Sequence, residues 1–479
     1  MLFNSLDFAI FLPIVFLLYW FVAQKNLKIQ NLLIVTASYV FYGWWDWRFL
    51  SLIIFSSILD YFIGIQIAKT KTICMRKLFL WLSICINLGF LGFFKYYNFF
   101  IDNFVQAFTF FGLEVKPNTL NIILPLGISF YTFQTLSYTI DVYKRKLKPT
   151  KDIISFLAFV SFFPQLVAGP IERASHLLPQ FYKKREFHYS KAVNGCKQIL
   201  WGLIKKVVIA DNCAYYANII FTDYQDFNAS TLFLGALFFA FQIYGDFSGY
   251  SDIAIGTSRL FGFNLKQNFA FPYFSRDIAE FWRRWHISLS TWFRDYLYIP
   301  LGGSKVGTLA KVRNTFLIFV VSGFWHGANW TFIIWGFLNA LFFLPLLLTN
   351  KNRINTSIVA QNSVLPNVKE LFQMSSTFLL IVIMWIFFRA ESISHALLYI
   401  NKMCSLSLVS FPNIFPKWLI VTVILFMLVE WFGRRDQFAI ETLLLKRSKV
   451  LKWAFYFMLI VLVFILKSET EQDFIYFQF

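Results

Sequence analysis

The chain has 479 residues, of which 58% are hydrophobic and 21% aromatic, but only 14% are charged. In a soluble protein about a quarter of the residues are charged, because the surface must be hydrated. Uncharged runs of about twenty residues recur from one end to the other, and each is long enough to cross the ~30 Å hydrocarbon core of a bilayer as a helix. The composition therefore excludes a soluble globular protein and predicts an all-α, polytopic membrane protein.

The formal net charge of +19 does not by itself indicate nucleic-acid binding. The basic residues form short clusters between apolar runs, which is the pattern of cytoplasmic loops that face anionic lipid. Membrane lipid is therefore an expected partner and nucleic acid is not. The five cysteines are scattered without a CxxC pair, so we expect neither a disulfide framework nor a metal site.

The apolar runs predict ten to twelve crossings and one or two re-entrant segments. The first run has no basic start and no cleavage site, so we expect a retained span rather than a signal peptide. The runs 153–170 and 192–222 are apolar too, but they are interrupted by proline or by charged residues. Lys205 and Lys206 in the second run suit a protein-buried or amphipathic helix. The clearer runs are 6–23, 30–43, 50–67, 78–97, 121–140, 231–249, 315–348, 371–388, 417–433 and 453–466.

Basic clusters predict which loops face the cytoplasm, because such loops remain on the inner side of a membrane. Counting crossings from these loops places both termini on the outer face. We expect a single integral-membrane domain, 1–479, with an acidic and aromatic tail, 467–479, outside. The clusters lie at 68–77, 143–151, 176–191 and 434–452.

Between residues 250 and 313 the sequence becomes richer in glycine, proline and arginine. Within it, FWRRWHISLSTWF (281–293) is too short and too charged to cross a bilayer, and we expect it to dip in from the cytoplasmic side or to lie on that interface. It contains His286, whose pKa Arg283 and Arg284 would lower by like-charge repulsion. A histidine in such a loop is more often merely solvated, and that reading stays open.

His326 lies in a run from Asn314 to Asn350 that contains no Asp, Glu, Lys or Arg. A continuous helix of that length would measure about 55 Å, so it must tilt, break or run through protein. Gly323 and Gly327 permit either a break or close helix packing. Imidazole exchanges a proton near neutral pH, and ionisable groups inside spans usually mark a site. The alternative is a neutral histidine bonded to a neighbouring helix.

The blocks around the two histidines resemble the paired signature of the membrane-bound O-acyltransferase family: WRRWHISLSTWFRDYLYIPLGGS (282–304) and SGFWHGANWTFIIWG (322–336). Further blocks of its bacterial branch are resembled by two more stretches, FFPQLVAGPIERASHLLPQF (162–181) and YGDFSGYSDIAIGTSRLFGF (244–263). Within that branch, the alginate O-acetylation type is most similar in length and in the sequence of these blocks. The resemblance covers nearly the whole chain. It implies a ring of about ten to twelve transmembrane helices with re-entrant segments around a central funnel.

The resemblance also implies roles for individual residues. His326 would be the catalytic histidine and His286 the second signature position. Asp246 and Asp252 are expected to be structural and to bind either backbone groups or the basic segment 276–313. An anionic acyl donor, acetyl-CoA or another acyl thioester, could be attracted by a set of basic side chains that could equally be plain interfacial charge: Arg283, Arg284, Arg294, Lys305 and Lys311.

The last six residues, FIYFQF (474–479), resemble the C-terminal motif of a small membrane partner used in teichoic acid D-alanylation. Tyr476 is the only nucleophile among them. One hypothesis is that Tyr476 accepts the acyl group with His326 as base. The other is an apolar tail that lies on the outer interface.

The resulting prediction is an enzyme, an O-acyltransferase of a bacterial cytoplasmic (inner) membrane. It would move an acyl group, most simply acetyl, from a cytosolic thioester to a cell-surface or exported polysaccharide of the alginate kind. A periplasmic or extracellular acetyltransferase partner, similar to SGNH hydrolases, is expected. Two alternatives stay open: a transporter or flippase for a lipid-linked sugar, and a non-catalytic subunit of a polysaccharide synthase.

Overall fold

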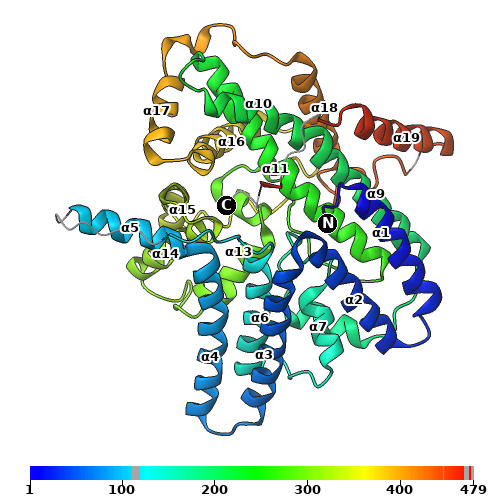
Figure 1. Ribbon diagram of the computed structural model, residues 1–479. Helices are drawn as coiled ribbons and strands as arrows, with labels where there is room; N and C mark the ends of the chain where they lie inside the picture. Colours follow the sequence, from blue (N-terminus) through cyan, green and yellow to red (C-terminus); the bar gives the residue numbers. More distant parts are fainter. Residues whose placement is uncertain (111–118, 446, 469–473, 476–479) are drawn as a thin grey trace. The chain divides into compact units, whose positions relative to one another are not determined.

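The computed structural model describes residues 1–110, 119–445, 447–468 and 474–475, and every regular element in them is helical. The chain forms two compact units (Figure 1). Unit 1 comprises residues 1–192 and 258–265, and unit 2 comprises residues 193–257 and 266–479.

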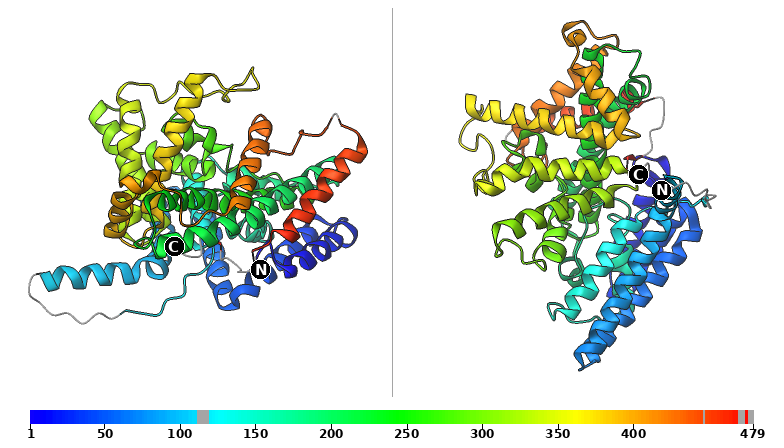
Figure 2. Two further views of the ribbon diagram at one scale, coloured as in Figure 1. Left: turned by 90° about the horizontal axis from the view of Figure 1, so that it is seen from above. Right: turned by 90° about the vertical axis from the view of Figure 1, so that its left-hand side faces the viewer.

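Unit 1 is built from the first part of the chain. Its helices α3, α4 and α6 pack side by side, as Figure 1 and the right-hand view of Figure 2 show. Its elements are α1 (Leu6–Leu17), η1 (Leu18–Val22), α2 (Leu27–Asp46), η2 (Trp47–Phe49), α3 (Leu50–Lys69), α4 (Ile73–Leu91), η3 (Gly92–Tyr96), α5 (Tyr97–Phe110), α6 (Ile128–Tyr143), α7 (Ile153–Ser161), α8 (Ala174–Leu177) and η4 (Leu178–Tyr182).

Polar side chains join α3 to α4 inside unit 1. The buried Asp60 carboxylate accepts hydrogen bonds from Ser83 Oγ at 2.6 Å and from Asn87 Nδ2 at 2.8 Å. Ser56 Oγ donates to Asn87 Oδ1 at 2.8 Å. In a membrane, such interhelical hydrogen bonds hold helices together where lipid removes the hydrophobic driving force for association.

The helix expected from residue 121 begins later, at Ile128, so that expectation is wrong at its start. Pro125 disfavours helical backbone in the residue before it. Gly127 caps the helix with φ of 73°, a left-handed conformation that glycine adopts without strain. A Cβ on Gly127 would also lie 2.6 Å from the carbonyl oxygen of Leu166, so the chain can turn here only with glycine.

Unit 2 is built around the long helix α11, which is almost entirely buried. The segment 281–293, which the sequence predicts to be too short to cross a bilayer, lies within two short helices. The elements of unit 2 are most of α9 (Tyr189–Leu203), η5 (Ile204–Ala210), α10 (Asp211–Thr222), α11 (Ala229–Leu260, to residue 257), η6 (Pro272–Phe274), α12 (Ile278–Arg284), α13 (Ile287–Phe293), η7 (Arg294–Tyr298), α14 (Thr308–His326), α15 (Trp330–Leu348), α16 (Val368–Arg389), α17 (Ile393–Met403), η8 (Leu406–Val409), α18 (Lys417–Gly433) and α19 (Lys449–Ile465).

Helices α14 and α15 form a tight hairpin, so the long uncharged run breaks as its length required. A Cβ on Gly323 would lie 2.1 Å from the carbonyl oxygen of Phe332. One on Gly336 would lie 2.3 Å from the carbonyl oxygen of Phe319. The two backbones therefore touch at glycine, which is the small-residue packing typical of membrane helices.

Five helical stretches within the described residues are long and apolar enough to cross a membrane. Together with the family assignment reported below, they make the protein a multi-pass membrane protein. They are Leu27–Lys69, Ile73–Phe110, Ala229–Leu260, Trp330–Leu348 and Val368–Arg389.

Candidate active site

His326 is the last residue of α14, and it is 3% exposed. The helix ends there because Gly327 is extended, with φ of −162° and ψ of 154°. The ring of Phe332 fills the space beside Gly327: a Cβ there would lie 2.1 Å from it. Asn329 then caps α15 by accepting a hydrogen bond from the Thr331 amide at 3.0 Å. The sequence thus places the imidazole at a helix end inside unit 2.

His286 links α12 to α13 and has φ of 44°, a left-handed conformation that is uncommon outside glycine. Asn268 holds this turn in place. Its carbonyl oxygen accepts from the Ile287 amide at 2.9 Å, and its side-chain oxygen accepts from Ser288 Oγ at 2.8 Å. A strained backbone that its surroundings over-determine is a frequent mark of a functional site.

The two histidine rings face each other at 6.2 Å between centroids. Aromatic rings surround them: Phe247 lies 4.6 Å from His286, and Trp335 and Phe388 lie 5.3 Å and 5.4 Å from His326. Trp325 lies within 6.0 Å of both. We call His286, His326, Phe247, Trp325, Trp335 and Phe388 the histidine cluster.

The environment of His286 favours an uncharged imidazole. Burial lowers its pKa well below the usual value, and the neighbouring His326 lowers it further. The sequence had suggested Arg283 and Arg284 as the cause, but desolvation by the protein dominates instead. A pKa held this low makes His286 a weak base, so its imidazole suits a neutral hydrogen-bonding role better than that of a general base, whose pKa should lie near the working pH.

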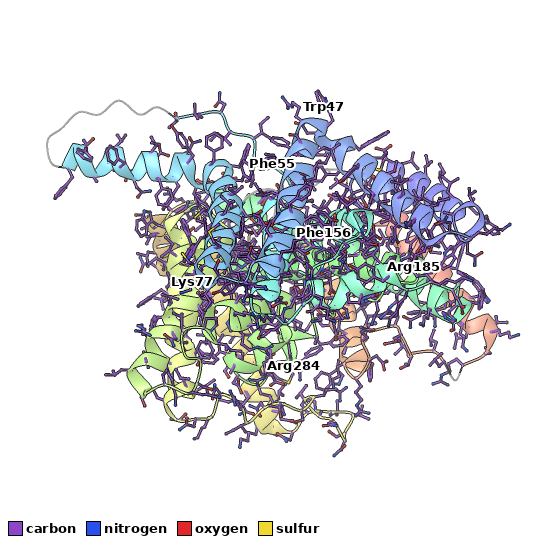
Figure 3. The ribbon with its side chains drawn as sticks, turned by 90° about the horizontal axis from the view of Figure 1, so that it is seen from below. Trp47, Phe55, Lys77, Phe156, Arg185 and Arg284 are labelled. Atoms are coloured by element: carbon purple, nitrogen blue, oxygen red, sulfur yellow. The ribbon has the colours of Figure 1, made fainter. Side chains whose placement is uncertain are left out.

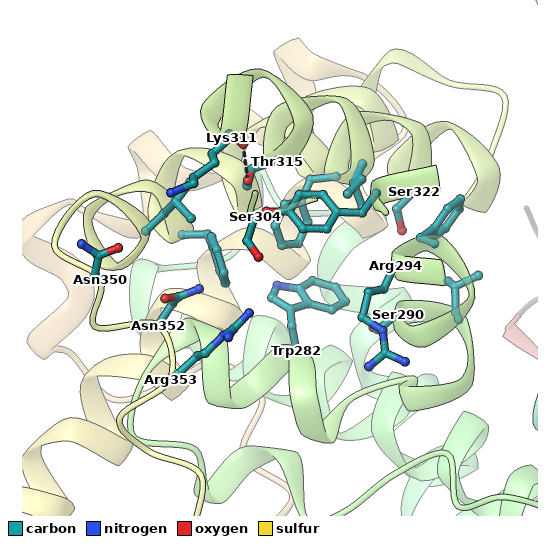
Figure 4. A pocket seen from close by; sticks show the side chains of 17 residues that line it. Trp282, Ser290, Arg294, Ser304, Lys311, Thr315, Ser322, Asn350, Asn352 and Arg353 are labelled. Atoms are coloured by element: carbon teal, nitrogen blue, oxygen red, sulfur yellow. Dashed lines mark hydrogen bonds between the residues drawn. The ribbon is translucent and has the colours of Figure 1, made fainter. Parts of the chain in front are cut away.

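A cavity of about 490 Å³ lies beside the histidine cluster in unit 2 (Figure 4). We call it the α14–α15 pocket. Ser322 in its wall is one helical turn before His326, and Leu289 is one turn after His286. Trp282 in the wall packs on Trp335, with ring centroids 5.6 Å apart. Trp335 in turn lies 5.3 Å from His326, so ring contacts link the wall of the pocket to that histidine.

Three basic residues line the α14–α15 pocket: Arg294, Lys311 and Arg353 (Figure 4). Asn350 and Asn352 add amide groups from the segment after α15. Guanidinium and ammonium groups bind phosphate through charge-assisted hydrogen bonds. The pocket thus combines an aromatic wall near the histidines with a cationic wall at the ends of α14 and α15.

The structure brings together only part of the basic set considered from the sequence. Arg294 and Lys311 line the pocket. Arg283 donates to the carbonyl oxygens of Asn352 and Asn355, each at 2.7 Å, and Arg284 pairs with Glu280 at 2.8 Å. The exposed Lys305 is outside the pocket lining.

Two buried lysines of η5 pair with acidic residues in unit 2. Lys205 Nζ lies 3.0 Å from Asp252 and 3.3 Å from Glu430. Lys206 Nζ lies 2.8 Å from both Asp211 and Asp246. We call these the Lys205 and Lys206 clusters. Asp246 and Asp252 therefore pair with the lysines of η5, whereas the sequence had suggested backbone or the basic segment 276–313 as their partners.

The C-terminal tail returns to the core of unit 2 at residues 474–475. The Ile475 amide donates to Asp246 Oδ2 at 2.6 Å. The Phe474 ring lies 4.8 Å from Tyr250 and 6.3 Å from Phe247, the ring that packs on His286. Asn212 Nδ2 donates to the Leu466 carbonyl at 2.8 Å. Tyr476 itself lies outside the described residues.

The membrane-bound O-acyltransferase family model matches residues 144–384, which include both histidines, the α14–α15 pocket and, except for Glu430, the Lys205 and Lys206 clusters. The chain belongs to this family. It is therefore an acyltransferase, with helices of membrane-spanning length.

Relatives match most of the chain. It is 41% identical over 448 residues to a "Probable alginate O-acetylase AlgI" of Pseudomonas putida, covering 91% of this chain and 88% of the relative. It is 37% identical over 439 residues to a "Peptidoglycan O-acetyltransferase" of Helicobacter pylori, covering 86% and 81%. A "Teichoic acid D-alanyltransferase" of Streptococcus thermophilus is 30% identical over 267 residues, 51% of this chain and 62% of that protein.

Several residues of the site were missed in the sequence. Arg353 follows α15 in a segment without a recognisable motif, and only the fold returns it to Lys311. Phe388 belongs to α16, some sixty residues after His326. Among the residues missed, Trp335 alone could have been suspected from the sequence, because it lies within the second histidine block. Its position in that block does not by itself indicate contact with His326.

Proposed function

We propose that the protein transfers an acetyl group from a cytosolic thioester, acetyl-CoA in the simplest case, for O-acetylation of a cell-surface or exported polysaccharide. The observation that carries this proposal is the pair of buried histidines that ring contacts, through Trp335 and Trp282, link to a pocket lined by basic side chains. The names of the relatives support O-acetylation of a polymer, and two of them specify alginate and peptidoglycan. An alginate-like exopolysaccharide is the acceptor we favour.

The α14–α15 pocket would hold the donor. Arg294, Lys311 and Arg353 suit the phosphate groups of a coenzyme A or of a carrier-protein arm. The aromatic wall formed by Trp282 suits the apolar part of the thioester arm. The thioester carbonyl would then lie near Ser322, one turn from His326.

His326 would act as the general base. Its neutral imidazole takes the proton of the acceptor hydroxyl while that oxygen attacks the thioester carbonyl. The carbon–oxygen bond forms, the carbon–sulfur bond breaks, and the leaving thiolate receives the proton back from the imidazolium. His286, held by Asn268, would keep the second imidazole in place beside it.

The C-terminal tail would supply the first acceptor. In this hypothesis the Tyr476 hydroxyl takes the acetyl group and passes it to the polymer through an SGNH hydrolase-like partner on the outer side. The docking of Phe474 and Ile475 beside the histidine cluster supports a tail that reaches inward.

The wider arrangement belongs to the same proposal. We place the protein in a bacterial inner membrane, with both termini outside and a single functional domain over the whole chain. Ten to twelve helices would form a ring around a central funnel, and the basic loops would face the cytoplasm, where the donor is made.

The competing function is a flippase for a lipid-linked sugar, which needs no base. The test uses His326→Ala, with His395→Ala as the matched control because His395 lies on α17, outside the histidine cluster and the α14–α15 pocket. Membranes are supplied with radiolabelled acetyl-CoA and acceptor polymer. Loss of a general base should reduce acetyl incorporation by about 10²- to 10⁴-fold, while the control stays at the wild-type rate.

A His326→Ala protein that incorporates acetyl groups at the wild-type rate would discard the enzymatic mechanism and leave the flippase. Protein abundance in the membrane is measured in parallel, so that a folding defect is not mistaken for lost chemistry.

A further inference from the structure

Unit 1 contains a second cavity, of about 260 Å³, that the acyl-transfer mechanism does not use. We call it the basic pocket. Five of its lining residues are basic and one, Glu186, is acidic. The basic ones are Lys183, Lys184, Arg185, Lys191 and Arg259.

Arg185 is the deepest of the basic side chains, at 5% exposure (Figure 3). Its guanidinium lies 4.8 Å from the centre of the Phe263 ring. Within the described residues its hydrogen bonds go to uncharged oxygens: the side-chain oxygens of Gln30 and Asn31, at 3.0 Å and 2.6 Å, and the carbonyl oxygen of Gln180 at 3.3 Å. Buried charges in proteins are normally paired with an opposite charge. The protein part that the structure describes gives this one hydrogen bonds but no carboxylate.

The surroundings of the basic pocket are those of a membrane interface. Trp20 of η1 lines the pocket and donates to the Leu260 carbonyl at 2.9 Å. The next two residues, Phe21 and Val22, are 79% and 69% exposed, as expected for side chains that face lipid. The Phe187 ring, also in the lining, packs on Trp20 at 5.6 Å. Exposed apolar, aromatic and basic side chains therefore follow one another over a short distance, which is the order from acyl chains to headgroups.

We propose that the basic pocket binds a phosphate-bearing anion, namely the headgroup of an anionic phospholipid. Arg185 would give the phosphate a fixed positive charge from below, and Lys183, Lys184 and Lys191 would surround it from the exposed side. Phe21 and Val22 would lie along the acyl chains. The lipid is a bound component of unit 1 and takes no part in the acyl transfer of unit 2.

The test measures lipid binding to the full-length protein in detergent by native mass spectrometry. Dioctanoyl phosphatidylglycerol, dioctanoyl phosphatidylcholine and inorganic phosphate are titrated separately and in competition. The wild-type protein should bind phosphatidylglycerol in preference to phosphatidylcholine. A triple variant, Lys183→Gln, Lys184→Gln and Lys191→Gln, should bind it about a hundredfold more weakly, because each lysine near a membrane surface contributes about a factor of five.

The matched control removes three lysines from another exposed basic segment of unit 1: Lys146→Gln, Lys148→Gln and Lys151→Gln. It makes the same change of net charge and should keep wild-type binding. Equal losses in both triple variants would overturn the site, because they would mean diffuse attraction. Wild-type affinity in the first triple variant would overturn it too. Displacement of phosphatidylglycerol by an equal concentration of inorganic phosphate would overturn the lipid assignment and identify a soluble phosphate compound instead.

Discussion

Helix α11 contributes side chains to two buried regions of unit 2 that contain ionisable groups. Asp246 and Asp252 pair with Lys206 and Lys205, so that ionisable groups of opposite sign lie buried and in contact in the interior of unit 2. One residue after Asp246, Phe247 packs on His286, whose pKa burial depresses. One region of unit 2 thus keeps its charges by pairing them, and the other keeps its ionisable group uncharged.

The difference separates stability from chemistry. A buried ion pair tolerates no removal of one partner, because the remaining charge is stranded in a low dielectric. A neutral imidazole carries no such penalty, because it needs no counter-charge. The Lys206 cluster also holds the tail, since Asp246 accepts from Ile475, so it connects the two regions.

The largest effect is expected from the charged region. Lys205→Met leaves Asp252 and Glu430 buried without their cation, which should destabilise the fold by about 3–5 kcal/mol. The melting temperature of the purified protein should fall steeply, and little monodisperse protein should survive extraction. Lys369→Met, on the exposed surface of α16, is the control and should melt with the wild type. A Lys205→Met protein of wild-type melting temperature would show that the pairing contributes nothing.

A smaller effect should separate the two carboxylates. Asp246→Ala removes both a partner of Lys206 and the acceptor of the Ile475 amide. Asp252→Ala removes a partner of Lys205 and the acceptor of Gln198 Nε2, but leaves the contact with the tail in place. Loss of a charge-assisted hydrogen bond of about 1.5 kcal/mol should expose the tail roughly tenfold more often. Carboxypeptidase digestion, followed by intact mass, should therefore shorten Asp246→Ala faster than Asp252→Ala.

The same pair of variants tests the tail in catalysis. If the tail carries the acceptor, Asp246→Ala should lose acetyl transfer in common with Tyr476→Phe, while Asp252→Ala keeps more of it at equal protein abundance. Equal digestion rates for both alanine variants would rule out Asp246 as the anchor of the tail.

The smallest effect concerns pH and the neutral region. The folded state holds His286 neutral, because its pKa lies well below the unfolded value of 6.5. Below that pH the unfolded chain binds a proton that the folded protein does not, so stability should fall as pH falls, by at most about 1.4 kcal/mol per unit. His286→Gln should flatten this slope in melting curves between pH 7 and pH 5. A slope unchanged in the variant would assign it to other groups.

The sequence was most informative where a physical limit applied. An uncharged run too long for a bilayer had to tilt, break or run through protein, and it breaks directly after His326. The segment 281–293 was too short to cross, and it forms two short helices. The pairing of the histidine blocks agrees with rings that lie 6.2 Å apart, although their roles still await experiment.

The sequence was least informative about partners distant along the chain. Nothing near Lys205 predicts Glu430, more than two hundred residues away, and nothing near Lys311 predicts Arg353. Arg284 shows the converse: as a charge in a motif it resembled a donor-binding group, yet Glu280, one turn earlier, pairs with it. The four-residue spacing of Glu280 and Arg284 predicts an ion pair only if the segment is known to be helical. The seven residues of α12 have too weak a sequence pattern to predict that helix.

The ending of α14 at His326 has an electrical consequence. The aligned peptide dipoles of a helix place a partial negative charge at its C-terminus, which stabilises a nearby cation by about 0.3–2 kcal/mol, depending on burial. A proton held by His326 during turnover would rest at this negative pole, while neighbouring aromatic faces offer it their electron-rich surfaces. The backbone at the end of α14 can thus itself supply a partial counter-charge for an imidazolium.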